Sequence, residues 1–204
     1  MSFHGQFGED VYMAGLFPPH YIGVCVEVGA YNGVGCSNTY HFEQKGWTCL
    51  CIEPNPTQFA ACKSVRKNAV NCAVGAEANA ECIFHVYNLS GGNESAISSL
   101  SPDPRLIASH AHLIRSTHTI PIQVRTLTEI LDEANFPRVI DFVSIDTENT
   151  ELDVLKGIDF TKYAIQYFIV ENNYDEPACR EYLQARGYTM IHRTGVNDIY
   201  KRSA

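Results

Sequence analysis

Apolar segments typical of β-strands alternate with helical segments along most of this chain, and this alternation restricts its fold more than any other feature. Residues 21–28 form a nearly continuous apolar run, which is typical of a strand covered on both faces. Similar runs predict further strands at residues 48–52, 70–74, 81–87, 122–126, 140–145 and 167–170. Helices are predicted at residues 37–45, 57–67, 105–116, 127–134, 150–156 and 177–186. Strands that alternate with helices indicate an α/β fold with a doubly wound, mostly parallel sheet.

The C-terminal segment breaks this alternation. Residues 188–192 and 198–201 predict a hairpin around Thr194 and Gly195, which adds an antiparallel edge to the sheet. The length of 204 residues is natural for one domain with a single core. No internal repeat, charge block or linker interrupts the chain, so residues 1–204 are expected to form one domain. Its compact start and lack of tails are also compatible with a domain excised from a larger enzyme.

The charge and the cysteine pattern exclude several classes of protein. Fifteen Lys and Arg residues against 23 Asp and Glu residues give a net charge of −8, which does not suit nucleic acid or an anionic membrane surface. No apolar stretch approaches the roughly 20 residues of a spanning helix, and no signal peptide opens the chain. We therefore expect a cytoplasmic protein without membrane insertion. The eight cysteines contain no C-x-x-C pair, and we expect them to be reduced.

The turn after the first predicted strand is the first candidate binding site. Ligands of doubly wound sheets bind outside the carboxyl ends of the strands. Gly29 allows a sharp turn there, and Gly33 is expected to remove a side chain where a ligand approaches the backbone. Tyr31 and Val34 stand where a dinucleotide-binding G-x-G-x-x-G loop needs glycine, and the chain has no P-loop for a triphosphate.

Two acidic residues flank this turn and indicate the ligand. Glu53 ends the second predicted strand, where a carboxylate can accept both hydroxyl groups of a ribose. Glu27 stands beside the turn and could hold an ammonium group. A ligand with a ribose and an amino acid but no phosphate fits this pair, and S-adenosylmethionine is such a ligand. The alternative is a tight turn in which the two acids only cap helices.

Eight segments in order along the chain carry a family resemblance. They are residues 5–10 (GQFGED), 27–33 (EVGAYNG), 37–39 (SNT), 46–47 (GW), 51–56 (CIEPNP), 126–127 (TL), 141–148 (DFVSIDTE) and 151–157 (ELDVLKG). Together they resemble the FkbM family of S-adenosylmethionine-dependent methyltransferases over nearly the whole chain. The chain departs from that family where Asn149 replaces a usual glycine and Glu27 replaces a more common Asp.

The resemblance implies a class I methyltransferase fold, which is Rossmann-like, and methyl transfer to an oxygen, usually on a sugar, a polyketide or a similar small metabolite. It implies cofactor contacts at Gln6, Asp10, Glu27, Gly29, Tyr31, Asn38, Glu53 and Pro54. The adenine would lie near residues 71–74, which include Cys72 and Ala73, and Gln6 and Asp10 would lie over the methionine end.

Three oxygen-bearing residues at strand ends predict a metal site. Asp146 follows the strand 140–145, and Glu171 and Asn172 follow the strand 167–170. These positions share the sheet edge with Gly29, and their oxygen ligands suit Mg²⁺, Mn²⁺ or Ca²⁺. The set is similar to the Asp…Asp-Asn triad of divalent-metal O-methyltransferases. The alternative is that Asp146 contacts the cofactor or caps a helix while Glu171 makes a structural hydrogen bond.

An aliphatic hydroxyl must lose its proton during methyl transfer, so a base is expected. Besides Asp146, the candidates are Glu148, which could instead be a helix first-turn residue, and His112 or His110, which could instead face solvent. His192 is a weaker candidate because a strand histidine is usually structural. The segment 90–95 is a candidate loop to close over the acceptor.

The expected function is thus O-methylation of a small molecule or glycan, with a sugar hydroxyl as the favoured acceptor and Mg²⁺ or Mn²⁺ as a candidate second cofactor. Two other classes stay open. One is a nicotinamide-dependent oxidoreductase or epimerase, against which the missing third glycine counts. The other is a module that keeps the fold but has lost the reaction. The sequence predicts no oligomeric state.

Overall fold

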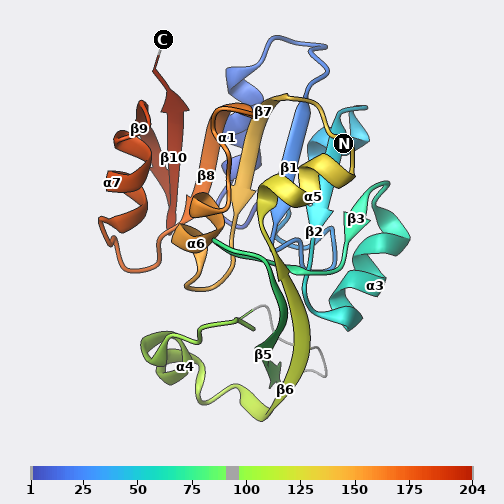
Figure 1. Cartoon of the computed structure of the whole chain (residues 1–204), viewed down its shortest axis with the longest axis vertical. Coiled ribbons are helices and arrows are strands. Elements are labelled where there is room, and N and C mark those ends of the chain that lie inside the picture. Colours follow the sequence, from blue (N-terminus) through green and yellow to red (C-terminus); the bar gives the residue numbers. More distant parts are fainter. Residues whose placement is uncertain (1, 91–96, 204) are drawn as a thin grey trace.

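The computed structural model describes residues 2–90 and 97–203. A seven-stranded sheet forms its centre, in the order β3-β2-β1-β7-β8-β10-β9 (Figure 1). The strands of this main sheet are β1 (Val24–Val28), β2 (Thr48–Ile52), β3 (Ala69–Val70), β7 (Val139–Ile145), β8 (Ala164–Glu171), β9 (Tyr188–Thr194) and β10 (Asn197–Arg202). The first five of these pair in parallel, and β10 pairs antiparallel with both β8 and β9. The predicted mostly parallel sheet with an antiparallel hairpin is confirmed.

Helices cover both faces of the main sheet. They are α1 (Glu9–Leu16), α2 (Tyr40–Gln44), α3 (Pro56–Val65), α5 (Leu127–Glu133), α6 (Glu151–Lys156) and α7 (Ala178–Gln184). Alternate residues of β1 point to opposite faces, so Val26 packs in the core under α5, α6 and α7, whereas Cys25 packs in the core under α1 and α2. This arrangement is the doubly wound α/β fold that the sequence predicted.

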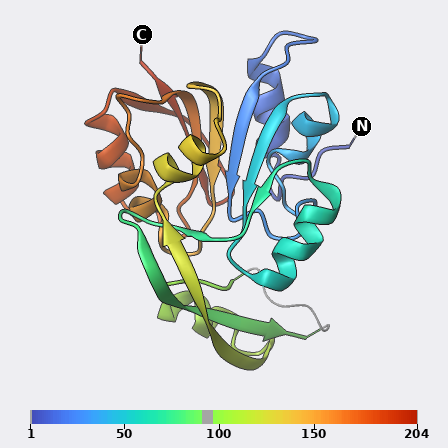
Figure 2. The ribbon, with the colours of Figure 1, turned by 45° about the vertical axis from the view of Figure 1, so that its right-hand side comes forward.

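A second sheet was not predicted. It has three strands in the order β4-β6-β5, namely β4 (Ala73–Val74), β5 (Asn79–Leu89) and β6 (Ile114–Arg125). Its long hairpin of β5 and β6 projects from the main sheet and carries α4 (Pro104–His110) at its far end (Figures 1 and 2).

Four predicted elements are therefore corrected. Residues 70–74 are two short strands in different sheets, because β3 pairs with β2 whereas β4 pairs with β6. The predicted strands 81–87 and 122–126 pair with each other in the second sheet. The predicted helix 105–116 ends at His110, and β6 begins at Ile114. One side of β6 faces solvent and carries exposed polar residues such as Arg115 and Thr117, so its sequence lacks the apolar run that predicts a strand.

The segment before α1, residues 5–8, lies across the carboxyl edge of the main sheet, and we call it the N-terminal strap. Gly5 forms a β-bridge with Cys36, and Thr194 Oγ1 donates a 2.7 Å hydrogen bond to the carbonyl oxygen of Phe7. The Phe7 ring packs so closely on Gly195 that a Cβ atom there would lie 2.3 Å from it. The strap thus joins residues that are far apart in the sequence.

All eight cysteines are free thiols in the structure. Cys25 and Cys49 lie side by side with 2.9 Å between their sulfur atoms, in the core under α1 and α2. None of the helices in residues 2–90 and 97–203 combines the length and the apolar character that crossing a membrane requires.

Candidate active site

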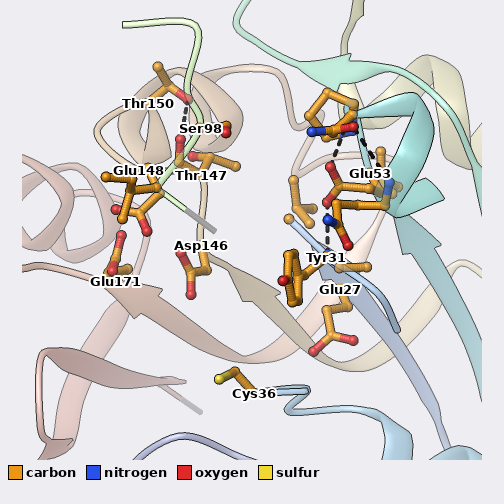
Figure 3. Close-up of a pocket in the computed structure, with 18 of the residues that line it drawn as sticks. Glu27, Tyr31, Cys36, Glu53, Ser98, Asp146, Thr147, Glu148, Thr150 and Glu171 are labelled. Atoms are coloured by element: carbon orange, nitrogen blue, oxygen red, sulfur yellow. Dashed lines mark hydrogen bonds between the residues drawn. The ribbon is translucent and has the colours of Figure 1, made fainter. Parts of the chain in front are cut away.

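A cavity of about 520 Å³ lies between the carboxyl edge of the main sheet and the second sheet. We call it the main cavity. Residues at the ends of β1, β2, β7 and β8 form one wall, and Phe84, Leu89 and Leu106 contribute to the wall from the hairpin and α4. In Figure 3, Tyr31 and Glu53 lie on one side of it and Asp146, Glu148 and Glu171 on the other. The sheet edge that the sequence predicts to bind a ligand therefore borders a cavity.

Gly29 is the residue at which the chain turns out of β1. Its φ of +84° lies in the left-handed region that favours glycine, and a Cβ atom there would lie 1.7 Å from the carbonyl oxygen of Asp146. Gly33 also has a positive φ, but it does not line the main cavity. A Cβ atom on Gly33 would instead meet Arg66 and Cys62 at 2.8 and 3.0 Å. The expected ligand approach at Gly33 is therefore wrong, and close protein packing is what requires glycine.

Glu27 anchors the loop that follows this turn. Its Oε2 atom accepts hydrogen bonds from Ser37 Oγ and Thr39 Oγ1, both at 2.7 Å, and pairs with buried Arg66 at 3.2 Å. Its Oε1 atom accepts one bond, from the backbone N–H of Asn38 at 2.6 Å. A carboxylate oxygen has two lone pairs, so Oε1 keeps one acceptor position on a carboxylate that lines the main cavity.

Glu53 is held on the opposite side of the turn. Its two oxygens accept backbone hydrogen bonds from Tyr31 and Asn55, both at 2.8 Å. Burial raises the pKa of Glu53 to about 8, although these two N–H groups act in the opposite direction. Pro54, Cys72 and Ala73 line the same part of the main cavity. The carboxyl group and this largely apolar wall are the two features that an adenosine would need.

Three carboxyl groups gather on the other side of the main cavity. Asp146, Glu148 and Glu171 each offer an oxygen, and all three oxygens lie within 4.8 Å of one another (Figure 3). We call these residues the carboxylate cluster. Burial raises the pKa of Asp146 to about 7 and that of Glu148 to about 9, and neighbouring carboxylates add to both shifts. The pKa of Glu171 is raised for the same reasons.

The loop after β7 places Glu148 in this cluster. Glu148 and Asn149 have φ values of +56° and +89°, so both adopt left-handed backbone. Ser99 Oγ donates to the carbonyl oxygen of Glu148, and Glu151 accepts the backbone N–H of Asn149 at 3.1 Å. The Oε2 atom of Glu148 is buried and has no hydrogen-bond partner among the described residues. An unpaired buried carboxylate oxygen is costly, which indicates a position built for a cation or a donor.

A family model described as "Methyltransferase FkbM domain" matches residues 27–190. The chain belongs to the FkbM methyltransferase family. The predicted family resemblance is confirmed.

Relatives of this FkbM chain are distant. "Methyltransferase 1" of Beauveria bassiana (strain ARSEF 2860) is 23% identical over 158 residues, which cover 70% of this chain and 63% of that protein. The chain thus spans less than two thirds of that relative. The N-terminal domain of human METTL16 is 11% identical with a TM-score of 0.50, over 95% of this chain and 66% of that one. M. capricolum TrmK, solved with S-adenosylhomocysteine, is 12% identical with a TM-score of 0.48, over 98% and 67%. The human structure supports the class I methyltransferase fold.

Asn172, predicted as a metal ligand of the FkbM site, is not in the cluster. Its side-chain amide donates to Asp198 Oδ2 at 2.9 Å and to the carbonyl oxygen of Glu176, and its Oδ1 accepts from the backbone N–H of Glu176. The side chain therefore holds the loop after β8 and does not line the main cavity. Glu148, which the sequence offered only as a base, takes its place beside Asp146 and Glu171.

Two more predicted cofactor contacts of this FkbM chain lie outside the lining of the main cavity. Gln6 lines it from the N-terminal strap, but Asp10 accepts backbone hydrogen bonds from His4 and Val11 at the start of α1. Asn38 donates its side-chain amide to Ser144 Oγ at 3.0 Å, beneath the loop. Both residues are buried and position the chain around the site.

The three histidine candidates differ in whether they line the main cavity. His110 lines the main cavity at the end of α4, whereas His112 is exposed and does not line it. His192 stacks on Tyr12 with 4.1 Å between ring centroids, away from the cavity lining. In the segment 90–95, Ser90 lines the main cavity, and residues 91–95 lie outside the described part of the chain.

Sequence reasoning missed the cavity wall formed by Phe84, Ile97, Leu100 and Leu106. These residues come from the second sheet and its connections, which the sequence pattern did not reveal. Asn55 and Gln58 were also missed, although Asn55 stands in the segment 51–56 that carries the family resemblance. The family resemblance of that segment was the sequence signal that could have indicated these two residues.

Proposed function

We propose that the chain transfers the methyl group of S-adenosylmethionine to a hydroxyl group of a small acceptor, with a sugar or glycan as the favoured class. The observation that carries this proposal is the carboxylate cluster, which lies in the same cavity as the turn at Gly29 and the carboxyl group of Glu53. We also propose that residues 1–204 act as one methyltransferase domain.

The cofactor would occupy the side of the main cavity near β1 and β2. The Glu53 carboxylate would accept the ribose hydroxyls, and Pro54, Cys72 and Ala73 would flank the adenine. Tyr31 lines the same side, where its N–H already holds Glu53 in place. The free acceptor position of Glu27 Oε1 and the amide of Gln6 suit the ammonium and carboxylate of the methionine end.

The methyl group must face the carboxylate cluster for transfer to occur. The acceptor oxygen then forms a bond to the methyl carbon as the carbon–sulfur bond breaks, and the acceptor proton passes to a base. Glu148 suits this role, because its unpaired Oε2 atom and raised pKa make its ionised form a strong proton acceptor. His110 is the second candidate, since it lines the same cavity. Alignment of donor and acceptor supplies most of the acceleration, up to about 7–11 kcal/mol in the best cases.

The residues of the cluster also fit a divalent cation. Asp146, Glu148 and Glu171 provide oxygen ligands from three positions, and oxygen-only sets favour Mg²⁺ or Mn²⁺ over softer metals. A cation bound there would stabilise the alkoxide that develops on the acceptor. The three side chains would hold the cation. Its binding would explain why three carboxyl groups are buried next to one another, which contacts within the protein do not explain.

The experiment is a methyl-transfer assay with donor labelled in the methyl group. The acceptors are free sugars, nucleotide sugars, glycans and small hydroxylated metabolites, each with and without Mg²⁺ or Mn²⁺. We expect a labelled methyl ether on one acceptor class. Transfer confined to nitrogen or sulfur atoms would overturn the proposed hydroxyl chemistry. Thermal stabilisation by NAD in place of S-adenosylhomocysteine would favour the nicotinamide-dependent alternative.

A further inference from the structure

A second cavity, of about 260 Å³, lies behind the carboxylate cluster. Glu148 and Glu171 line both this cavity and the main cavity, and Leu106, Thr150 and Asn173 do so as well. The second cavity therefore meets the reacting region from the side opposite the cofactor wall. A molecule seated in it could present one group to the cluster without displacing the cofactor.

The charged residues that line the second cavity are all acidic. Six acidic residues line it, namely Asp103, Glu148, Glu151, Asp153, Glu171 and Glu176. In the part of the chain that the structure describes, neither cavity is lined by Lys or Arg. A phosphate or carboxylate group placed there would lose its hydration without gaining a cationic side chain, whereas hydroxyl and ammonium groups would find acceptors.

Arg105 pairs with two of the acidic residues in this wall. Arg105 donates to Asp103 at 2.6 Å and to Glu176 at 2.8 Å, and its guanidinium lies 3.7 Å from the centre of the Tyr174 ring. Asp153 pairs with Lys156 at 3.1 Å on the outer side of α6. Glu148 and Glu171 form no ion pair among the described residues, and the buried Glu148 Oε2 atom has no partner there. An acceptor phosphate would thus meet two acidic side chains without ion pairs and no free Lys or Arg side chain among the described residues.

Polar uncharged groups complete the wall. Asn149 and Asn173 bring amides, and Thr150 brings a hydroxyl, next to the two shared carboxylates. Closely spaced acceptors and amides of this kind suit the adjacent hydroxyl groups of a sugar ring. The size is also suitable, because the second cavity adjoins the main cavity and so needs to hold only the part of the acceptor that does not react.

We propose that the second cavity is the acceptor subsite, and that it selects an uncharged or amine-bearing sugar and rejects sugars that carry phosphate or carboxylate groups. This inference rests on the proposed function and narrows its acceptor class. It removes sugar phosphates, nucleotide sugars and uronic acids from the acceptors to be considered.

The test is a binding measurement that does not depend on turnover. The chain, saturated with S-adenosylhomocysteine and kept free of divalent cations with EDTA, is titrated with four related sugars and followed by saturation-transfer NMR. The sugars are methyl glucoside, glucosamine, glucose 6-phosphate and glucuronic acid. We expect the first two to bind at least tenfold more tightly than the last two.

A cavity-filling variant locates the binding. Ala178 lines the second cavity from the exposed start of α7, so Ala178→Trp should fill the cavity and weaken sugar binding at least tenfold. Affinity for S-adenosylhomocysteine should stay unchanged. Ala185→Trp, at the exposed far end of the same helix, is the matched control and should bind as the unmodified chain does.

Three results would overturn the inference: binding of the anionic sugars as tightly as the neutral ones, no binding of any of the four at millimolar concentration, or unchanged binding in Ala178→Trp. Failure of the proposed function is a separate result, because it appears as absent hydroxyl methylation in the turnover assay whichever sugars bind.

Discussion

The carbonyl oxygen of Asp146 lies 1.7 Å from the position that a Cβ atom on Gly29 would occupy. The turn that leaves β1 and the end of β7 are therefore in direct backbone contact. Gly29 lies on the side of the main cavity proposed for the cofactor, and Asp146 belongs to the carboxylate cluster, so this contact sets the distance between the two halves of the site.

Gly29→Ala should therefore damage both folding and binding. The left-handed backbone alone costs about 1–2 kcal/mol, and the clash with Asp146 adds to it. A loss above about 2 kcal/mol lowers the melting temperature by roughly 4–8 °C for a chain of this size. Gly187→Ala is the control, since Gly187 has a φ of +80° with nothing within 4 Å. Calorimetric melting of both variants checks this, and equal losses would show that the contact with Asp146 is unimportant.

Cofactor affinity should depend on pH through Glu53. Its pKa is raised to about 8, so at pH 7 most of the free protein carries the protonated acid. Ribose hydroxyls donate to the ionised form, so binding releases a proton, and affinity should rise by up to roughly tenfold per pH unit between pH 6 and 8 and then level off. Titration calorimetry with S-adenosylhomocysteine at several pH values measures this.

Glu53→Gln is the matched variant for that measurement. It keeps the volume of the side chain but cannot ionise, so it should bind more than tenfold less tightly above pH 8 and lose the pH dependence. An unchanged slope in this variant would assign the proton to another group and remove Glu53 from the ribose contact.

The carboxylate cluster should control turnover without controlling cofactor binding. Glu148→Gln and Glu171→Gln should each weaken Mn²⁺ binding and lower kcat at least about a hundredfold, because each removes one charged ligand. Mn²⁺ binding is followed by electron paramagnetic resonance. Glu181→Gln is the control, since Glu181 is exposed and lines neither cavity. Full activity after exhaustive chelation would eliminate the cation and leave proton transfer to a side chain.

The two histidines near α4 should behave differently. His110→Ala should lower kcat by about 10²-fold if its ring takes the acceptor proton, because His110 lines the main cavity. His112→Ala should leave activity unchanged, since His112 is exposed outside the cavity lining. The kcat of each variant with a hydroxylated acceptor is the measurement. A loss confined to the His110 variant supports the base, and equal kcat values for both variants contradict it.

The side of the main cavity proposed for the cofactor was predictable because local residue types determine its backbone. Gly29 needs a left-handed backbone where the chain leaves β1, and Glu53 ends the neighbouring strand β2, so parallel pairing brings the two together. Both facts can be read from spacing and residue type. The same reasoning placed Asp146 and Glu171 at one edge, which the cluster confirms.

The carboxylate cluster, on the side proposed for the acceptor, was less predictable because the backbone direction decides which side chains reach it. Glu148 reaches the cluster through a left-handed backbone at residues 148 and 149. Asn149, which stands where the family usually has glycine, tolerates this conformation, but Glu rarely adopts it, so residue type does not predict where the Glu148 side chain lies. Asn172 follows Glu171 directly, and successive residues of a strand point to opposite sides, which explains why one joins the cluster and the other does not. The second sheet was missed since Asn71 and Cys72 separate two strands that read as one.

The N-terminal strap has a consequence for how the molecule is made. Asn197, at the start of β10, donates to Glu9 at 2.6 Å, and Phe7 packs on Gly195. A ribosome synthesises Gln6 and Phe7 almost two hundred residues before Asn197, yet those residues can dock only once the hairpin of β9 and β10 exists. Gln6 and Phe7 line the main cavity, so this part of the cavity wall is completed only late in folding, after the last strand has been synthesised.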